Sequence, residues 1–323
     1  MNRPVALVIA ALVLALPLSL LAGRVWINPL DPHTANAAII LLQLRLPRAC
    51  LALCVGAGLG GAGAAMQGYL RNPLADPGLF GIAPGAALGA VLSLWLGAAS
   101  VWALPAFALI GAGGAMALLA LIAGQSQGNS GGVALFTLAG MMIASLAGAL
   151  MSLAISLSPT PLALSEIVTW LMGALADRSW RDVLTAAPLT LAGLAALGKA
   201  GRSLDALTLG EAAARSLGVD PRRLQWLMIA GVGLTVGAGV AVAGIIGFVG
   251  LMVPHLVRPF TDRRPSSTLL PSALAGALLL LVADCLCRIM PLAGGELRLG
   301  IALSLLGAPF FLALLLRMRK GTA

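Results

Sequence analysis

Asp284 and Arg288 are two charged residues whose types and spacing could support chemistry inside an apolar segment. The two residues are four apart in an otherwise apolar stretch, so they share one face of any helix formed there. A charge inside a membrane-spanning helix is costly unless it is paired or near the interface. The pair is therefore either an ion-coupling site of a secondary transporter or a structural ion pair near a helix end. We favour the structural ion pair.

The metal-ligating residue types form no recognisable site. The four cysteines fall in or beside apolar runs, and their spacing matches no zinc or disulfide framework. We interpret them as small buried hydrophobes. The two histidines are too far apart in the sequence to argue for a metal or haem site, so we predict no metal site, no catalytic residue and no bound cofactor. These residues are Cys50, Cys54, Cys285, Cys287, His33 and His255.

The charged segment 203–221 separates two apolar stretches. Good helix formers run from Glu211 to Leu217, and Gly218 follows in the position of a helix C-cap. Asp220 and Pro221 are suited to begin the next helix. The segment is either an amphipathic helix lying on the bilayer or a coupling helix that inserts into a partner protein.

Composition sets the environment in which these segments must fold. The chain is 60% hydrophobic and only 10% charged, with a mean hydropathy of +1.01. Between Asp76 and Glu166 lie 89 residues without a formal charge, which excludes a soluble domain. The net charge of +9 fits the positive-inside rule of membrane proteins. Nucleic-acid binding explains the positive charge poorly, because the sequence has no stripe of basic residues and few aromatic residues.

A bilayer needs about 20 apolar residues of helix per crossing. On that measure the sequence predicts an all-α polytopic membrane protein with about ten transmembrane helices in one domain, 1–323. The 34-residue stretch Leu224–Val257 is divided in two near Gly244, Gly247 and Gly250. The other expected helices are Pro4–Ala22, Ala49–Leu70, Ile82–Leu96, Trp102–Ala123, Val133–Leu157, Val183–Gly198, Ser267–Cys287 and Leu299–Leu316.

The distribution of basic residues orients this bundle. Ten helices place both termini on one side, and 13 of the 20 Lys and Arg residues fall on that side. We therefore predict that both termini and the segment 203–221 are cytoplasmic. The other side holds the remaining seven: Arg24, Arg45, Arg48, Arg178, Arg181, Arg288 and Arg298.

Several motifs, in order along nearly the whole chain, resemble the permease family of ATP-driven importers for iron–siderophores, haem and vitamin B12 (the FecCD-type, or type II, importers). Leu209–Val219 resembles the family's ATPase-docking loop. Arg45–Arg48 resembles the motif before its second helix, and Gln67–Gly78 the loop after it. The segments Gly247–Arg258 and Leu306–Phe310 match as well.

This resemblance implies a set of partners in a bacterial inner membrane. ATPase subunits would bind on the cytoplasmic side and carry the ATP and Mg²⁺, while this chain has no phosphate-binding loop of its own. A periplasmic substrate-binding protein would deliver the substrate, and a second permease copy would complete the path. The segment Gln125–Gly132 would lie near a cytoplasmic gate. The coupling residues would be Leu209, Gly210, Glu211, Ala212, Ala213, Arg215, Leu217 and Gly218.

The resemblance also suggests a role for three arginines on the opposite side. Arg45, Arg48 and Arg288 would form a positive surface for acidic residues of the binding protein, since complementary charges speed encounter and fix register. Contact with lipid headgroups is the alternative. For Arg288 the two readings are nearly even.

The resulting prediction is a permease subunit, not itself an enzyme, that imports a metal chelate. Iron–siderophore leads because it is the commonest substrate of the family, with haem and vitamin B12 as alternatives. An ion-coupled secondary transporter would need several carboxylates in the membrane, and only Asp284 qualifies. A membrane-embedded enzyme would need a cluster of His, Asp or Ser that the sequence lacks.

Overall fold

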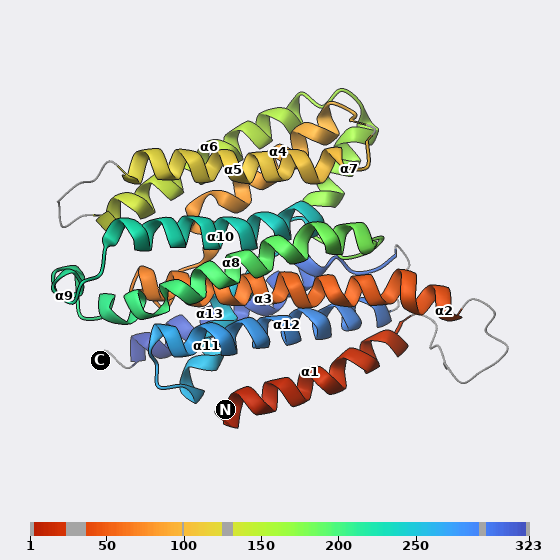
Figure 1. The fold of residues 1–323 in the computed structure, drawn as a ribbon. Helices are drawn as coiled ribbons and strands as arrows, with labels where there is room; N and C mark the ends of the chain where they lie inside the picture. The colour runs from red at the N-terminus through yellow and green to blue at the C-terminus, as the bar shows by residue number, and fades with distance from the viewer. Residues whose placement is uncertain (1–2, 24–36, 99, 125–131, 291–294, 321–323) are drawn as a thin grey trace.

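The computed structural model describes residues 3–23, 37–98, 100–124, 132–290 and 295–320 of the chain. Within these ranges the regular elements are helices, which run roughly parallel to one another along a common direction (Figure 1). They are α1 Arg3–Leu21, α2 Ala37–Ile39, η1 Ile40–Arg45, α3 Leu46–Tyr69, η2 Pro77–Phe80, α4 Ile82–Trp95, α5 Ala103–Gly124, α6 Gly132–Ser156, α7 Pro161–Leu171, α8 Trp180–Leu207, α9 Glu211–Ser216, α10 Pro221–Ala243, α11 Val249–Val257, η3 Arg258–Phe260, α12 Pro265–Ile289 and α13 Leu299–Lys320.

Seven helices in the described part of the chain are long and apolar enough to cross a membrane. Three shorter apolar helices, Val5–Leu21, Ile82–Trp95 and Pro161–Leu171, accompany them. The structure is therefore that of an all-α polytopic membrane protein, as predicted. The number of ten crossings and the cytoplasmic side of both termini stay predictions, although α13 ends on the same side of the bundle as α9 (Figure 1).

The long stretch Leu224–Val257 breaks where its glycines predicted, but its second half is not a full crossing. The chain leaves α10 at Gly244 and re-enters a helix only at Val249. The resulting α11 has nine residues, which span about 14 Å at 1.5 Å per residue. Phe248, just before it, has a left-handed backbone with φ of 67°, so the break is a sharp turn and not a kink.

Two other expected boundaries are wrong. The helix expected from Ala49 already begins at Ala37, through a π-helical stretch at Ile40–Arg45, so the Arg45–Arg48 motif lies within the helix and not before it. The helix expected to end at Gly198 continues to Leu207 and shortens the segment 203–221. The α8 extension carries polar residues that hydropathy assigns to a loop, but its apolar residues Leu204 and Leu207 are buried against the bundle.

The centre of the bundle is built on small residues. α10 is the most buried of the seven spans, and α3 packs extensively against α12 and α8. At the α3–α12 crossing, Gly56 and Gly60 of one helix face Ser272 and Gly276 of the other at backbone contact. Lipid tails supply no hydrophobic drive between helices, so such close approach is a main source of packing energy in membranes.

Candidate functional site: two ends of the bundle

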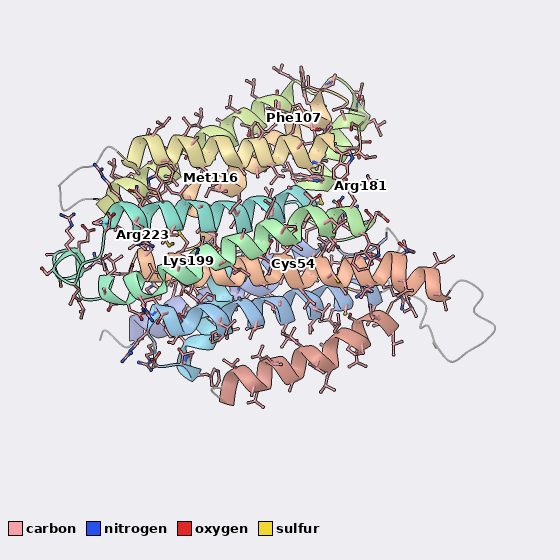
Figure 2. The ribbon with its side chains drawn as sticks, viewed as in Figure 1. Cys54, Phe107, Met116, Arg181, Lys199 and Arg223 are labelled. Atoms are coloured by element: carbon pink, nitrogen blue, oxygen red, sulfur yellow. The ribbon has the colours of Figure 1, made fainter. Side chains whose placement is uncertain are left out.

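The predicted coupling residues come together in a compact turn at one end of the bundle. α9, Glu211–Ser216, stands between α8 and α10 and projects beyond both (Figure 1). Asp220 caps α10 by accepting a 2.9 Å hydrogen bond from the Arg222 backbone N–H, as its position before Pro221 predicted. In Figure 2, Arg223 marks this end of the bundle and Arg181 the other.

Backbone hydrogen bonds close α9 at its C-terminus. The Gly218 N–H donates to the Arg215 carbonyl at 2.9 Å, and the Val219 N–H donates to the Ala214 carbonyl at 3.0 Å. This is a Schellman motif, which requires a left-handed residue, and Gly218 has a φ of 85°. The C-cap predicted from the sequence is therefore confirmed.

α9 presents an apolar and charged surface to the outside. Its inner contact is Ala214, 2% exposed, which the sequence analysis did not single out. Leu209 and Leu217, on either side of the helix, are 68% and 64% exposed although they lie outside the membrane-spanning helices. Exposed apolar side chains that are rimmed by charged residues suit a protein–protein contact.

Two of the three arginines predicted for docking, Arg48 and Arg288, meet at a different place, around a buried carboxylate. Asp284 on α12 is fully buried and lies between Arg48 of α3 and Arg288. Arg48 donates to Asp284 Oδ1 from Nη2 at 2.9 Å and from Nε at 3.0 Å. The Arg288 Nε to Asp284 Oδ2 distance is 3.1 Å, so the structural ion pair predicted from their spacing is present.

A fourth residue, Glu296, completes this buried ion cluster of Arg48, Asp284, Arg288 and Glu296. Its Oε2 lies 2.7 Å from Arg48 Nη2, and its side chain is 30% exposed. Sequence reasoning missed Glu296, because nothing in its immediate neighbourhood signals a partner on α3. The cluster holds two arginines and two carboxylates, so the formal charges of its four side chains balance.

Arg45 joins the same end of the bundle through the end of α1. Its Nη1 donates to the carbonyls of Leu20 and Leu21, both at 2.8 Å. These carbonyls belong to the last turn of α1, where a cation is favoured by the helix dipole. Arg288 Nη1 lies 3.4 Å from the next carbonyl, that of Ala22. The three arginines thus lie at one end of the bundle, and each is engaged within the chain.

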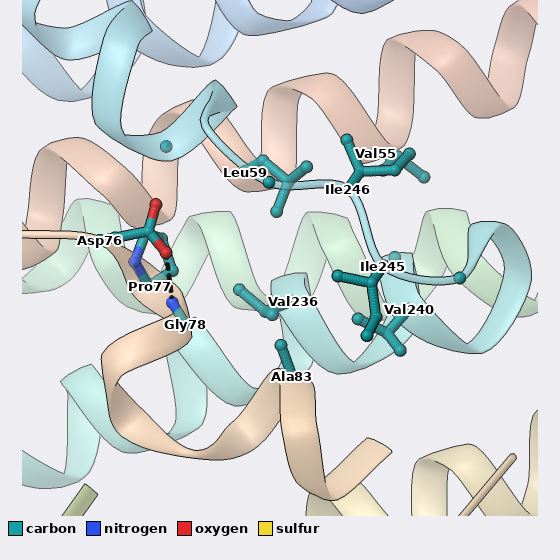
Figure 3. A pocket seen from close by; sticks show the side chains of 14 residues that line it. Val55, Leu59, Asp76, Pro77, Gly78, Ala83, Val236, Val240, Ile245 and Ile246 are labelled. Atoms are coloured by element: carbon teal, nitrogen blue, oxygen red, sulfur yellow. Dashed lines mark hydrogen bonds between the residues drawn. The ribbon is translucent and has the colours of Figure 1, made fainter. Parts of the chain in front are cut away.

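A small cavity of about 90 Å³ lies in the interior beside the Gly244–Gly247 break (Figure 3). Val55 and Leu59 of α3 and Val236 and Val240 of α10 line it, together with the turn at Asp76. The carboxylate of Asp76 accepts a 2.7 Å hydrogen bond from the Gly78 N–H (Figure 3). Substrate-sized sites measure roughly 300–1,000 Å³, so this cavity does not hold a chelate.

The remaining predictions concern the gate segment, the histidines and the cysteines. The expected gate segment falls almost wholly on 125–131, and His33 on 24–36, both outside the described residues. The described cysteines are free and lie in half-buried or buried positions. In the described ranges, no group of three or more His, Cys, Asp or Glu residues is placed to hold a metal.

Comparison with known proteins assigns the chain to a family. The model of the FecCD transport family matches residues 10–317. The chain is 38% identical to the vitamin B12 import system permease protein of Escherichia coli O9:H4 (strain HS), over 96% of this chain and 93% of that protein. It is 37% identical to the protein of the same description from Yersinia enterocolitica, over 99% and 94%.

A solved structure gives the same result. It is described as an inward-facing conformation of a metal-chelate type ABC transporter, and it superposes with a TM-score of 0.87 at 34% identity. The match covers 97% of this chain and 98% of that one. The chain therefore belongs to the FecCD transport family, and it is a multi-pass permease subunit of a bacterial inner-membrane ABC importer in which a separate subunit hydrolyses ATP.

Proposed function

We propose that this permease imports a bulky metal chelate and that α9 is the element through which the ATPase drives it. The observation that carries the coupling role is the surface of α9, where Leu209 and Leu217 stay exposed beside Glu211 and Arg215. The short links to α8 and α10 join this surface directly to two long helices of the bundle. A displacement of α9 therefore reaches the membrane-spanning part through rigid elements.

Replacing Glu211 with Arg is expected to weaken binding of the ATPase subunit by at least about tenfold, because it reverses a charge on the docking turn. The measurement is co-purification and stimulated ATP hydrolysis in nanodiscs. Lys199→Glu, an exposed charge reversal on the neighbouring α8, is the matched control and should change neither. Unaltered assembly of the Glu211→Arg protein, or equal loss in both variants, would remove α9 from the interface.

We propose that the opposite end receives the periplasmic binding protein through Arg45, Arg48 and Arg288. Arg48 and Arg288 are already paired inside the buried ion cluster, and Arg45 binds the end of α1. A carboxylate of an acidic partner must therefore either bind Arg45 in addition to its present contacts or displace the half-buried Glu296 from Arg48. Exchange of one carboxylate for another keeps the cluster balanced and so avoids leaving a buried charge unpaired.

We propose further that two copies of the chain enclose the substrate path. The interior cavity beside the α10 break is too small for a chelate, which favours a path between subunits. α6 and α13 carry many exposed apolar side chains, among them Met142 and Leu305 at 72% and 67% exposure. These faces suit either lipid or a second copy, and a homodimer is the arrangement we propose.

The substrate class follows from the relatives and not from a visible site. The matching permeases of Escherichia coli and Yersinia enterocolitica are described as vitamin B12 importers, whereas iron–siderophore led in the sequence analysis only by its frequency in the family. We therefore rank cobalamin first and ferric siderophore second.

Proteoliposomes that contain the permease, its ATPase and its binding protein are expected to accumulate radiolabelled cobalamin only when ATP is enclosed. Uptake of a ferric siderophore is measured in parallel, and vesicles without ATP are the control. Preferential siderophore uptake would reverse the ranking. Uptake of neither compound, with ATP hydrolysis intact, would contradict the proposed chelate class.

A further inference from the structure

Three arginines from separate segments line one pocket at the end of the bundle that carries α9. Arg71 follows α3, Arg258 begins η3, and Arg263 lies in the turn before α12. The pocket has a volume of about 250 Å³. Thr208, two residues before Gly210 at the start of α9, also lines it. We call this site the arginine pocket.

Hydrogen bonds hold one of these arginines in place. Arg258 Nη2 donates to Gln67 Oε1 at 2.9 Å, and Gln67 Nε2 in turn donates to the Leu251 carbonyl at 3.2 Å. The Gln67 amide is thereby oriented by α11 and presents its oxygen to Arg258. Within the described part of the chain this is the only hydrogen bond of the Arg258 side chain, so four of its five N–H donors have no protein partner.

Within the described ranges, no carboxylate forms an ion pair with the arginines of the arginine pocket. The ion pairs among the described residues involve Arg48, Arg264 and Arg288, and none involves the three arginines of the pocket. Burial, followed by the charge of Arg263, lowers the pKa of Arg258. Like charges brought together without a counter-ion repel, and an anion in the pocket would relieve that repulsion.

The acidic residues on the flanking elements are occupied elsewhere. Asp205 accepts hydrogen bonds from the Ser266 N–H at 2.8 Å and from its hydroxyl at 2.5 Å. Asp262 is bound by Ser267 and pairs with Arg264 at 3.5 Å. Neither carboxylate lines the arginine pocket, so none of the described residues around it supplies a negative charge.

The backbone of the arginine pocket is strained as well. Arg71 and Arg263 have φ values of 50° and 62°, in the left-handed region that non-glycine residues rarely adopt. They are two of the four such residues in the described ranges, and both line this pocket. Backbone strain of this kind is concentrated at functional sites, where the surrounding structure stabilises the strained conformation.

We propose that the arginine pocket binds a phosphate group, carried either by the headgroup of an anionic phospholipid or by a free phosphate. Guanidinium groups match phosphate oxygens in bidentate geometry, and three of them from different segments can surround one group. The volume exceeds that of a bare ion and leaves room for a headgroup. Basic pockets between membrane helices near the cytoplasmic surface are suited to acidic lipids.

The test uses the full-length permease in nanodiscs of phosphatidylcholine, with binding read by native mass spectrometry and by the melting temperature. Phosphatidylglycerol is added in one arm and inorganic phosphate in the other. The double variant Arg71→Gln/Arg263→Gln is expected to bind the preferred anion about tenfold more weakly than the wild type. Arg222→Gln/Arg223→Gln, two exposed arginines at the same end of the bundle, is the matched control and should bind like the wild type.

The two arms identify the source of the phosphate. Binding of phosphatidylglycerol but not inorganic phosphate assigns the pocket to lipid, and the reverse assigns it to a free anion. Equal weakening in both double variants, or no weakening in either, would overturn the proposal. If the double variant melts at a lower temperature than the wild type, the single variants Arg71→Gln and Arg263→Gln replace it. Both side chains are exposed, so neither substitution should disturb the fold. Each substitution should weaken anion binding on its own.

Discussion

Replacing Asp284 with alanine is expected to lower the free energy of unfolding by about 3–5 kcal/mol, because it leaves Arg48 and Arg288 buried without their shared counter-ion. The two arginine side chains are only 12% and 5% exposed, so water cannot take over the role of the carboxylate. Glu296 touches Arg48 alone and leaves Arg288 unpaired. The measurement is denaturant-induced unfolding of the purified permease in detergent.

The control for this prediction is an ion pair on the surface. Asp262 and Arg264 are 3.5 Å apart with both side chains more than half exposed, so Arg264→Ala should change stability very little. The double variant Asp284→Ala/Arg288→Leu should recover part of the loss, because it removes one of the stranded charges. If Asp284→Ala abolished uptake but left stability unchanged, the ion-coupling reading of Asp284 would replace the structural one.

Replacing Gly276 with alanine is expected to destabilise the protein by about 3 kcal/mol or more, since overpacking here meets backbone and not a flexible side chain. A Cβ at Gly276 would overlap the carbonyl oxygen of Gly56, and a Cβ at Gly56 would overlap that of Gly276. α3 and α12 can therefore accept even one methyl group only by moving apart along a major interface of the bundle. Thermal unfolding of the purified variant measures the effect.

Gly148→Ala on α6 is the matched control, because a Cβ at that position has open space around it. In a helix interior this change is expected to be neutral or to stabilise by up to about 1 kcal/mol. Both substitutions replace glycine with alanine, and only Gly276→Ala should destabilise the protein. Similar small effects of both would mean that the α3–α12 crossing is looser than its backbone contacts indicate.

The sequence by itself determined the environment and the local elements of this protein. Long apolar runs predict helices that cross a bilayer, because hydropathy is a property of consecutive residues. The break in Leu224–Val257, the C-cap at Gly218 and the start of α10 at Pro221 were also predictable. Caps and breaks depend on residues within one or two turns, and the sequence displays them directly.

The tertiary structure alone decided which of these elements meet. Arg48 and Asp284 are 236 positions apart, and nothing local marks them or Glu296 as partners. Hydropathy likewise predicted that a helix ends at Gly198, whereas packing keeps the following polar segment helical as far as Leu207. The arginine pocket draws its charges from three segments. Which side chains pair across a bundle depends on how each helix is rotated and shifted against its neighbours. Backbone contacts such as that between Gly56 and Gly276 set this arrangement. The order of residues along one helix does not reveal it.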